Sequence, residues 1–118
     1  MEYMLLIFSN ESDYKAMSDA QRQEMSGAYA AYTEALQKAG VLRAGQRLRP
    51  VESATTVRVR SGKTEVLNGP YAETREQLGG YYLIEAPDLD AALAWAARCP
   101  AASHGAMEVR PVWPMGAP

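Results

Sequence analysis

Two short segments of the chain carry apolar side chains on both of their faces. Residues 3–8 read Tyr-Met-Leu-Leu-Ile-Phe, and residues 80–86 read Gly-Tyr-Tyr-Leu-Ile-Glu-Ala. Both runs are too short for an ordinary helix, so we interpret them as strands. A strand that is apolar on both faces lies in the middle of a sheet covered above and below. These segments are therefore predicted to be central strands.

Two other segments have the apolar spacing of amphipathic helices. Residues 18–21 read Ser-Asp-Ala-Gln, a capping box, and apolar residues then recur at helical spacing as far as Gly40, a C-terminal stop. Asp88 is placed to cap a second helix over residues 89–99. We interpret Gly27, inside the first helix, as a position of close packing.

The remaining strands are predicted to be one-sided. Residues 55–60 alternate cleanly, and Ser61-Gly62 is typical of a hairpin turn into residues 63–67. Residues 107–113 form the last strand. We place 55–60 and 107–113 at the edges of the sheet, and we interpret residues 41–50, with Gly45 and Pro50, as at best a bent or edge strand.

This order of elements predicts one α+β domain over residues 1–118, with 114–118 as a tail. It is the order of a ferredoxin-like sheet with two helices on one face. Two helices cover only one face, so the apolar residues on the other face need a second cover. We therefore expect a face-to-face homodimer, which is a dimeric α+β barrel.

Composition narrows the class of protein. Apolar residues make up 47% of the 118, charged residues 22%, and the net charge is −2. We expect a folded protein without nucleic acid or membrane as a partner. Cys99 is the only cysteine and His104 the only histidine. This excludes a disulfide framework, favours the cytoplasm and argues against a metal site; we expect Cys99 in the core and His104 on the surface.

The segment between the hairpin and the second central strand is rich in special backbone residues and functional groups. It reads Asn68-Gly69-Pro70-Tyr71 and then Ala-Glu-Thr-Arg-Glu over residues 72–76. With residues 79–86 and 108–112, this motif resembles the YCII-related family, in the subgroup named for an Asp-Gly-Pro-Phe motif. Asn68 and Tyr71 depart from that motif.

The resemblance implies a ferredoxin-like fold that forms a dimeric α+β barrel, and it implies no settled activity. We expect no cofactor. In the family the motif Asp is a candidate acid or base, a role that the Asn68 amide cannot fill. Members of the subgroup are often associated with alternative sigma factors, which implies a protein partner.

Charged and phenolic side chains of the predicted sheet are candidates for a ligand site. We expect Arg58, Arg60, Glu108 and Arg110 to point away from the helices, beside Tyr81 or Tyr82. Such a cavity suits a small anionic or carbonyl-bearing ligand. The alternative is that Glu108 and the arginines only form cross-strand ion pairs.

The motif loop supplies the other candidates. Gly69-Pro70 is interpreted as a backbone device that fixes the geometry of the loop. Asn68 and Tyr71 are candidate ligand-binding groups, and Glu73 and Glu108 are candidate catalytic acids or bases. The alternative is that Asn68 and Glu73 only tie down the loop by turn and capping bonds.

Two hypotheses of function follow. The first is a small dimeric protein that binds a small ligand between the motif loop and the sheet, as a cofactor-free enzyme or as a binding protein. The second is a regulatory or protein-interaction module without catalysis. A concave pocket favours the first hypothesis, and a flat motif loop that exposes Tyr71 favours the second.

Overall fold

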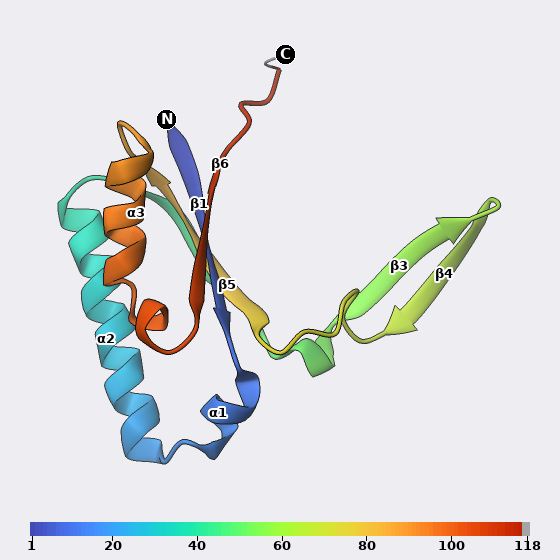
Figure 1. Cartoon of the computed structure of the whole chain (residues 1–118). Coiled ribbons are helices and arrows are strands. Elements are labelled where there is room, and N and C mark those ends of the chain that lie inside the picture. The colour runs from blue at the N-terminus through green and yellow to red at the C-terminus, as the bar shows by residue number, and fades with distance from the viewer. Residues whose placement is uncertain (117–118) are drawn as a thin grey trace.

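The computed structural model describes residues 1–116 and places four strands in one antiparallel sheet (Figure 1). These strands are β1 (Glu2–Ser9), β2 (Leu42–Arg47), β5 (Gln77–Glu85) and β6 (Ala106–Pro111), in the order β2-β5-β1-β6. β1 and β5 are the middle strands, as their two-sided apolar pattern predicts. Residues 117 and 118 of the predicted tail lie outside the described residues.

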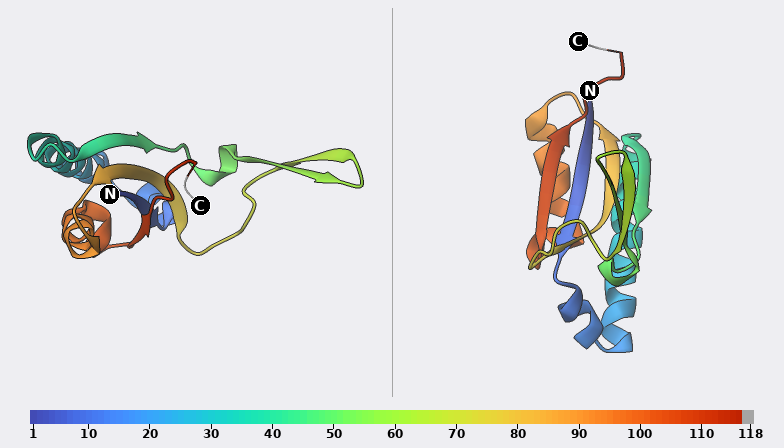
Figure 2. Two further views of the ribbon diagram at one scale, coloured as in Figure 1. Left: turned by 90° about the horizontal axis from the view of Figure 1, so that it is seen from above. Right: turned by 90° about the vertical axis from the view of Figure 1, so that its right-hand side faces the viewer.

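Two long helices cover one face of this sheet (Figures 1 and 2). They are α2 (Asp19–Lys38) and α3 (Leu89–Arg98). The predicted caps are confirmed, because Ser18 and Gln21 form a reciprocal capping box and the Asp88 side chain accepts from the Ala91 N–H at 2.9 Å. Within residues 1–116 no helix is long and apolar enough to cross a bilayer.

A third helix, α1 (Glu11–Ala16), occupies a segment that the sequence pattern leaves as a polar connection. Asn10 caps it by accepting a hydrogen bond from the Ser12 N–H at 2.9 Å. Glu11 and Asp13 in its first turn complement the helix dipole. The helix has no buried residue, and so it gives no apolar periodicity to detect.

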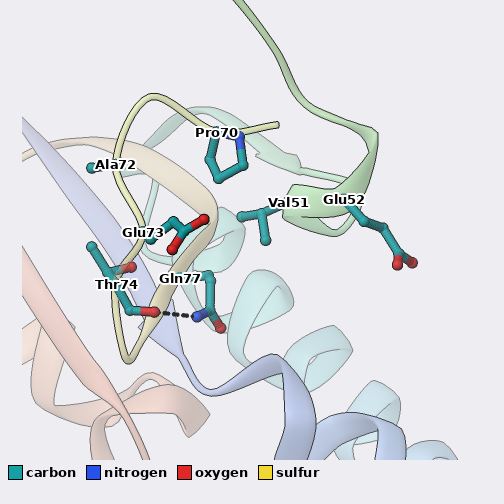
Figure 3. Close-up of a pocket in the computed structure, with 7 residues that line it drawn as sticks. All are labelled: Val51, Glu52, Pro70, Ala72, Glu73, Thr74 and Gln77. Atoms are coloured by element: carbon teal, nitrogen blue, oxygen red, sulfur yellow. Dashed lines mark hydrogen bonds between the residues drawn. The ribbon is translucent and has the colours of Figure 1, made fainter. Parts of the chain in front are cut away.

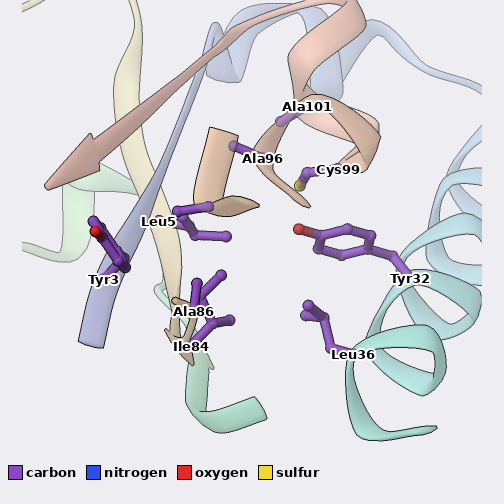
Figure 4. Close-up of a cluster of buried hydrophobic side chains, with 10 residues drawn as sticks. Tyr3, Leu5, Tyr32, Leu36, Ile84, Ala86, Ala96, Cys99 and Ala101 are labelled. Carbon is purple, nitrogen blue, oxygen red and sulfur yellow. The ribbon is translucent and has the colours of Figure 1, made fainter. Parts of the chain in front are cut away.

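The core lies between the sheet and the two long helices (Figure 4). Leu5, Leu36 and Ile84 are completely buried at its centre. The Tyr32 hydroxyl, which α2 brings into this layer, is satisfied because it donates to the Trp95 carbonyl at 2.7 Å. Cys99 is 2% exposed, which confirms its predicted place in the core, and burial raises the pKa of its thiol.

The predicted hairpin exists, but its predicted place in the sheet is wrong. β3 (Thr55–Arg60) and β4 (Lys63–Asn68) form a separate two-stranded sheet, joined through Ser61 and Gly62, both at positive φ. This hairpin, the arm, extends away from the main sheet on the side opposite α2 and α3 (Figures 1 and 2). Clean alternation identifies a strand, but it does not identify the strand's neighbour.

The edge position belongs instead to β2, in the segment interpreted as at best a bent or edge strand. Leu42 of β2 packs against the core, and Gly45 lies opposite Tyr82 of β5. A Cβ at Gly45 would stand 2.9 Å from Cδ1 of Tyr82. The glycine therefore makes room for an aromatic ring from the neighbouring strand. The low strand propensity of glycine does not reveal this role.

The face of the sheet away from the helices carries the second apolar set of the middle strands. Tyr3, Leu5 and Ile7 of β1 belong to the core or pack against it, so Met4, Leu6 and Phe8 point to the other side. Tyr81 lies opposite Leu6, and Leu83 lies opposite Met4. We call this surface the open face; Figure 2 shows it toward the viewer in the right-hand view.

Replacing Gly80 by a residue with a side chain should destabilise the fold. A Cβ at this position would stand 2.6 Å from the Gln46 carbonyl oxygen, which belongs to the β2 backbone. We expect Gly80→Ala to lower the free energy of unfolding by about 1–3 kcal/mol, because β2 must move. Urea unfolding measures this.

The matched control is Gly27→Ala. The prediction of close packing there is wrong, because nothing lies within 4 Å of a Cβ built on Gly27. This substitution should stabilise α2 by about 1 kcal/mol. Equal effects of the two substitutions would contradict the close approach of β2 to Gly80.

Candidate functional site

The motif loop leaves the arm in a fixed direction. Gly69 has φ +109, a backbone conformation that favours glycine. Its N–H donates to the Ala54 carbonyl at 2.7 Å, and its carbonyl accepts from the Thr56 hydroxyl at 2.8 Å. Pro70 follows directly. These contacts confirm that Gly69-Pro70 fixes the backbone geometry of the loop.

A chain of hydrogen bonds ties the far end of the loop to α1 and to the 3-10 turn η1 (Val51–Ser53). The Gln77 side chain donates to the Thr74 carbonyl at 2.6 Å and accepts from the Glu11 N–H at 2.9 Å. The Glu11 carboxylate in turn accepts from the Val51 N–H at 3.2 Å. Three segments distant in sequence are thus held together by two side chains.

An open pocket of about 330 Å³ lies between the loop and η1 (Figure 3). The Glu73 carboxylate points between Pro70, Val51 and Gln77, whereas the Glu52 carboxylate points away from them. The full lining is Val51, Glu52, Pro70, Ala72, Glu73, Thr74 and Gln77. It includes two carboxylates and no Lys or Arg, so this pocket by itself disfavours the anionic part of the predicted ligand class.

Within residues 1–116, neither Asn68 nor Glu73 makes a side-chain hydrogen bond or an ion pair. The interpretation that they tie down the loop is therefore wrong, because Gln77 and Glu11 do so. Both side chains remain available to a ligand. Glu73 is exposed in the loop, and Asn68 is exposed at the end of β4.

Three of the predicted site residues lie on the open face. Tyr81 of β5 and Glu108 of β6 flank Leu6, and Arg110 flanks Met4 on the same side. Arg110 and Glu108 form an ion pair with a nitrogen–oxygen distance of 2.5 Å. Tyr82, the alternative to Tyr81, lies on the helix side instead. There it shares a 2.7 Å hydrogen bond with Thr33, and burial raises its pKa.

The motif loop closes one end of this face. It enters β5 at Gln77, which lies opposite Ser9, and Phe8 is the next residue of β1 inward. Leu6 and its neighbours Tyr81 and Glu108 form a row across the strands, about 7 Å from Phe8. Met4 and its neighbour Arg110 form the next row, about 7 Å beyond Leu6. The loop, the row that holds Tyr81 and Glu108, and the row that holds Arg110 thus follow one another along the open face.

Arg58 and Arg60 do not join this group, because β3 belongs to the arm. The Arg58 guanidinium stacks on the Tyr71 ring at 4.7 Å from its centroid, at the base of the arm. Arg60 lies near the tip, 4.0 Å from the Glu65 carboxylate. The predicted convergence of these arginines with Arg110 within one chain is wrong. His104 is exposed, as predicted.

Sequence reasoning missed the residues that hold the pocket. Gln77 and Glu11 are polar residues at the start of a strand and of an unpredicted helix, and Val51 lies in a short turn. Their contacts join positions that are 40 and 66 residues apart. The one local signal is Gln77 itself, a polar residue immediately before an apolar strand.

Loss of the Gln77 side chain should loosen the motif loop. Gln77→Ala removes both bonds of that amide, and we expect it to lower the free energy of unfolding by about 1–2 kcal/mol. Amide exchange of residues 72–76 should become faster. Gln23→Ala, an exposed position in α2, is the control and should change stability by less than about 0.5 kcal/mol. If the amides of residues 72–76 exchange at the same rate in Gln77→Ala as in the wild type, Gln77 does not hold the loop.

Comparison with known proteins gives the loop and the sheet a family context. The family model of the YCII-related domain matches residues 1–116. An uncharacterized protein of Rhizobium meliloti (strain 1021) is 39% identical over 114 residues, which cover 95% of this chain and 92% of that protein. The narrower resemblance to the Asp-Gly-Pro-Phe subgroup stays a prediction. The chain belongs to the YCII-related family.

Proposed function

We propose that the chain functions as a homodimer of ferredoxin-like subunits, packed face to face through the open face. One observation carries this proposal. The middle strands are apolar on both sides, and both long helices of the chain lie on one side (Figure 1). Met4, Leu6, Phe8 and Leu83 are then left for a second subunit to cover.

The surface area of the chain supports a dimer of ordinary size. Its accessible surface is 8289 Å², whereas a compact monomer of 12.9 kDa exposes about 6,300 Å². A standard protein–protein interface buries about 800 Å² on each partner. The chain thus has about 2,000 Å² of surplus surface, enough for such an interface and for further contacts.

We further propose that each subunit binds a small carbonyl- or carboxylate-bearing molecule between the motif loop and the sheet. Tyr81 and Arg110 supply a hydroxyl and a guanidinium on a face that is otherwise largely apolar. A guanidinium pairs with a carboxylate in two parallel hydrogen bonds. The bound molecule would displace the Glu108 carboxylate from Arg110.

The same groups suit a cofactor-free enzyme. Glu108 would take a proton from the carbon next to the carbonyl group of the substrate, and the electron pair would move to the carbonyl oxygen. Arg110 and Tyr81 would donate hydrogen bonds to that oxygen as it gains negative charge. Asn68 takes no part in proton transfer, since its amide does not titrate.

A protein-interaction module is the second candidate. The observation that favours it is Tyr71, which is 75% exposed on the motif loop and stacked on Arg58. An exposed aromatic–arginine pair is the kind of anchor that recurs at protein interfaces. Tyr71→Ala should abolish capture of a protein partner and leave dimerisation and small-molecule binding unchanged.

A charge at the centre of the open face should separate the subunits. We expect Leu6→Asp, or Leu83→Lys as a second variant, to sediment as a folded monomer under conditions in which the wild type sediments as a dimer. Leu93→Asp is the control, since Leu93 is 45% exposed on α3 and should not affect assembly. A wild-type chain that sediments as a monomer at 100 µM would refute the homodimer.

Ligand binding is tested by thermal shift with a panel of short 2-oxo acids and dicarboxylates. A compound at 100 times its dissociation constant stabilises the fold by about 2.7 kcal/mol, which raises Tm by several degrees. Arg110→Ala should remove this shift, whereas Arg43→Ala on β2 should preserve it. If no compound raises Tm of the dimer, the ligand proposal fails while the homodimer stands.

A further inference from the structure

We propose that the arm reaches across to a second copy of this chain and packs an apolar stripe of valines against it. The inference rests on the proposed homodimer and adds a second, separate contact to it. In such an assembly each subunit holds the other by its arm, as well as through the open face.

The arm is amphipathic. Val57 lies directly opposite Val66, and Val59 follows on the same face, with exposed fractions of 59%, 61% and 67%. The opposite face is charged, with Arg58 opposite Glu65 and Arg60 opposite Lys63. One side of the ribbon therefore suits water, and the other, which we call the valine face, suits an apolar surface.

The arm lacks the support that a stable ribbon needs. Among residues 1–116, its strands pair only with each other and not with the main sheet. A two-stranded hairpin alone in water is marginally stable, and its stability comes from packing one face against something else. The body of its own chain does not supply that surface, because the arm points away from it (Figure 1).

The base of the arm is nevertheless held firmly. Thr55 and Asn68 form the last pair of the ribbon, and the Gly69 N–H bond to Ala54 closes it at 2.7 Å. The Thr56 hydroxyl bonds the Gly69 carbonyl, and Tyr71 stacks under Arg58. These contacts close the base of the arm on itself. The hydrogen bond from the Val51 N–H to the Glu11 carboxylate ties the segment just before the arm to α1, and this tie orients the arm relative to the body of the chain.

That direction leads past a second subunit. The arm leaves the sheet on the side of the open face (Figures 1 and 2). Each strand has six residues, which extend over roughly 20 Å, whereas two packed sheets lie about 10 Å apart. An arm of this length passes the gap between two face-to-face sheets and continues alongside the second subunit.

The extended shape of the chain supports a second copy as the occupant. Its radius of gyration is 16.4 Å, whereas a compact domain of this length has about 13.5 Å. The surplus of about 2,000 Å² exceeds the roughly 800 Å² that a standard interface buries on each partner. In a two-fold dimer the arm and the surface that it covers occur once on each subunit, so both arms are sheltered.

Hydrogen exchange of the arm amides tests the inference. In the wild-type dimer, amides of residues 55–68 should exchange at least tenfold more slowly than in the Leu6→Asp monomer. Amides of β1 and β5 serve as the internal control, because the core side of these strands stays covered by the helices in both proteins. Sedimentation of the same samples establishes which species is present.

Two substitutions test the two faces of the arm independently. Val59→Asp places a charge on the valine face and should raise the dimer dissociation constant about tenfold or more. Leu67→Asp is the matched control, since Leu67 is 54% exposed and lies opposite Thr56, away from the valine face. It should change that constant less than about twofold.

The outcomes distinguish this inference from the proposed function. A dimer whose arm exchanges as fast as in the Leu6→Asp monomer would overturn the arm contact and leave the homodimer intact. Equal effects of Val59→Asp and Leu67→Asp would also overturn it. A wild-type chain that sediments as a monomer throughout would overturn both.

Discussion

The fold depends on an imbalance between apolar surface and cover. The middle strands β1 and β5 are apolar on both faces, and α2 and α3 bury only the side that holds Leu5 and Ile84. Met4, Leu6, Phe8 and Leu83 on the other side are only partly buried, so covering the rest of their apolar surface would add stabilisation. A second subunit is the cover that the chain itself can supply.

This constraint places part of the candidate chemistry on the open face, which is the surface that the proposed homodimer would share. Tyr81, Glu108 and Arg110 lie on the open face, and the motif loop closes one end of it. Polar groups at such a position would be partly desolvated when the subunits pair, which strengthens their hydrogen bonds to a ligand. The loop pocket with Glu73 carries no basic group in its lining. Assembly and ligand binding are therefore coupled in the proposed function.

The arm shows that an alternating apolar–polar pattern predicts a strand but does not predict whether that strand joins the main sheet. Its alternation is as clean as that of a sheet edge, yet the segment before it, with Gly45 and Pro50, takes the edge position. Gly45 fits there because the Tyr82 ring lies where a Cβ would be. The hairpin is left with a valine face that its own chain does not cover.

Local patterns alone determined the middle strands, the capped helices α2 and α3, the hairpin turn and the rigid Gly69-Pro70 step, because neighbouring residues supply the interactions that form them. The motif that begins at Asn68 also indicated membership in the YCII-related family. Tertiary structure alone decided which strand borders β5 and which of Tyr81 and Tyr82 faces outward. It also decided that Gln77 and Glu11 hold the loop and that Arg58 leaves the sheet. These outcomes depend on contacts between distant segments, whose register no local period specifies.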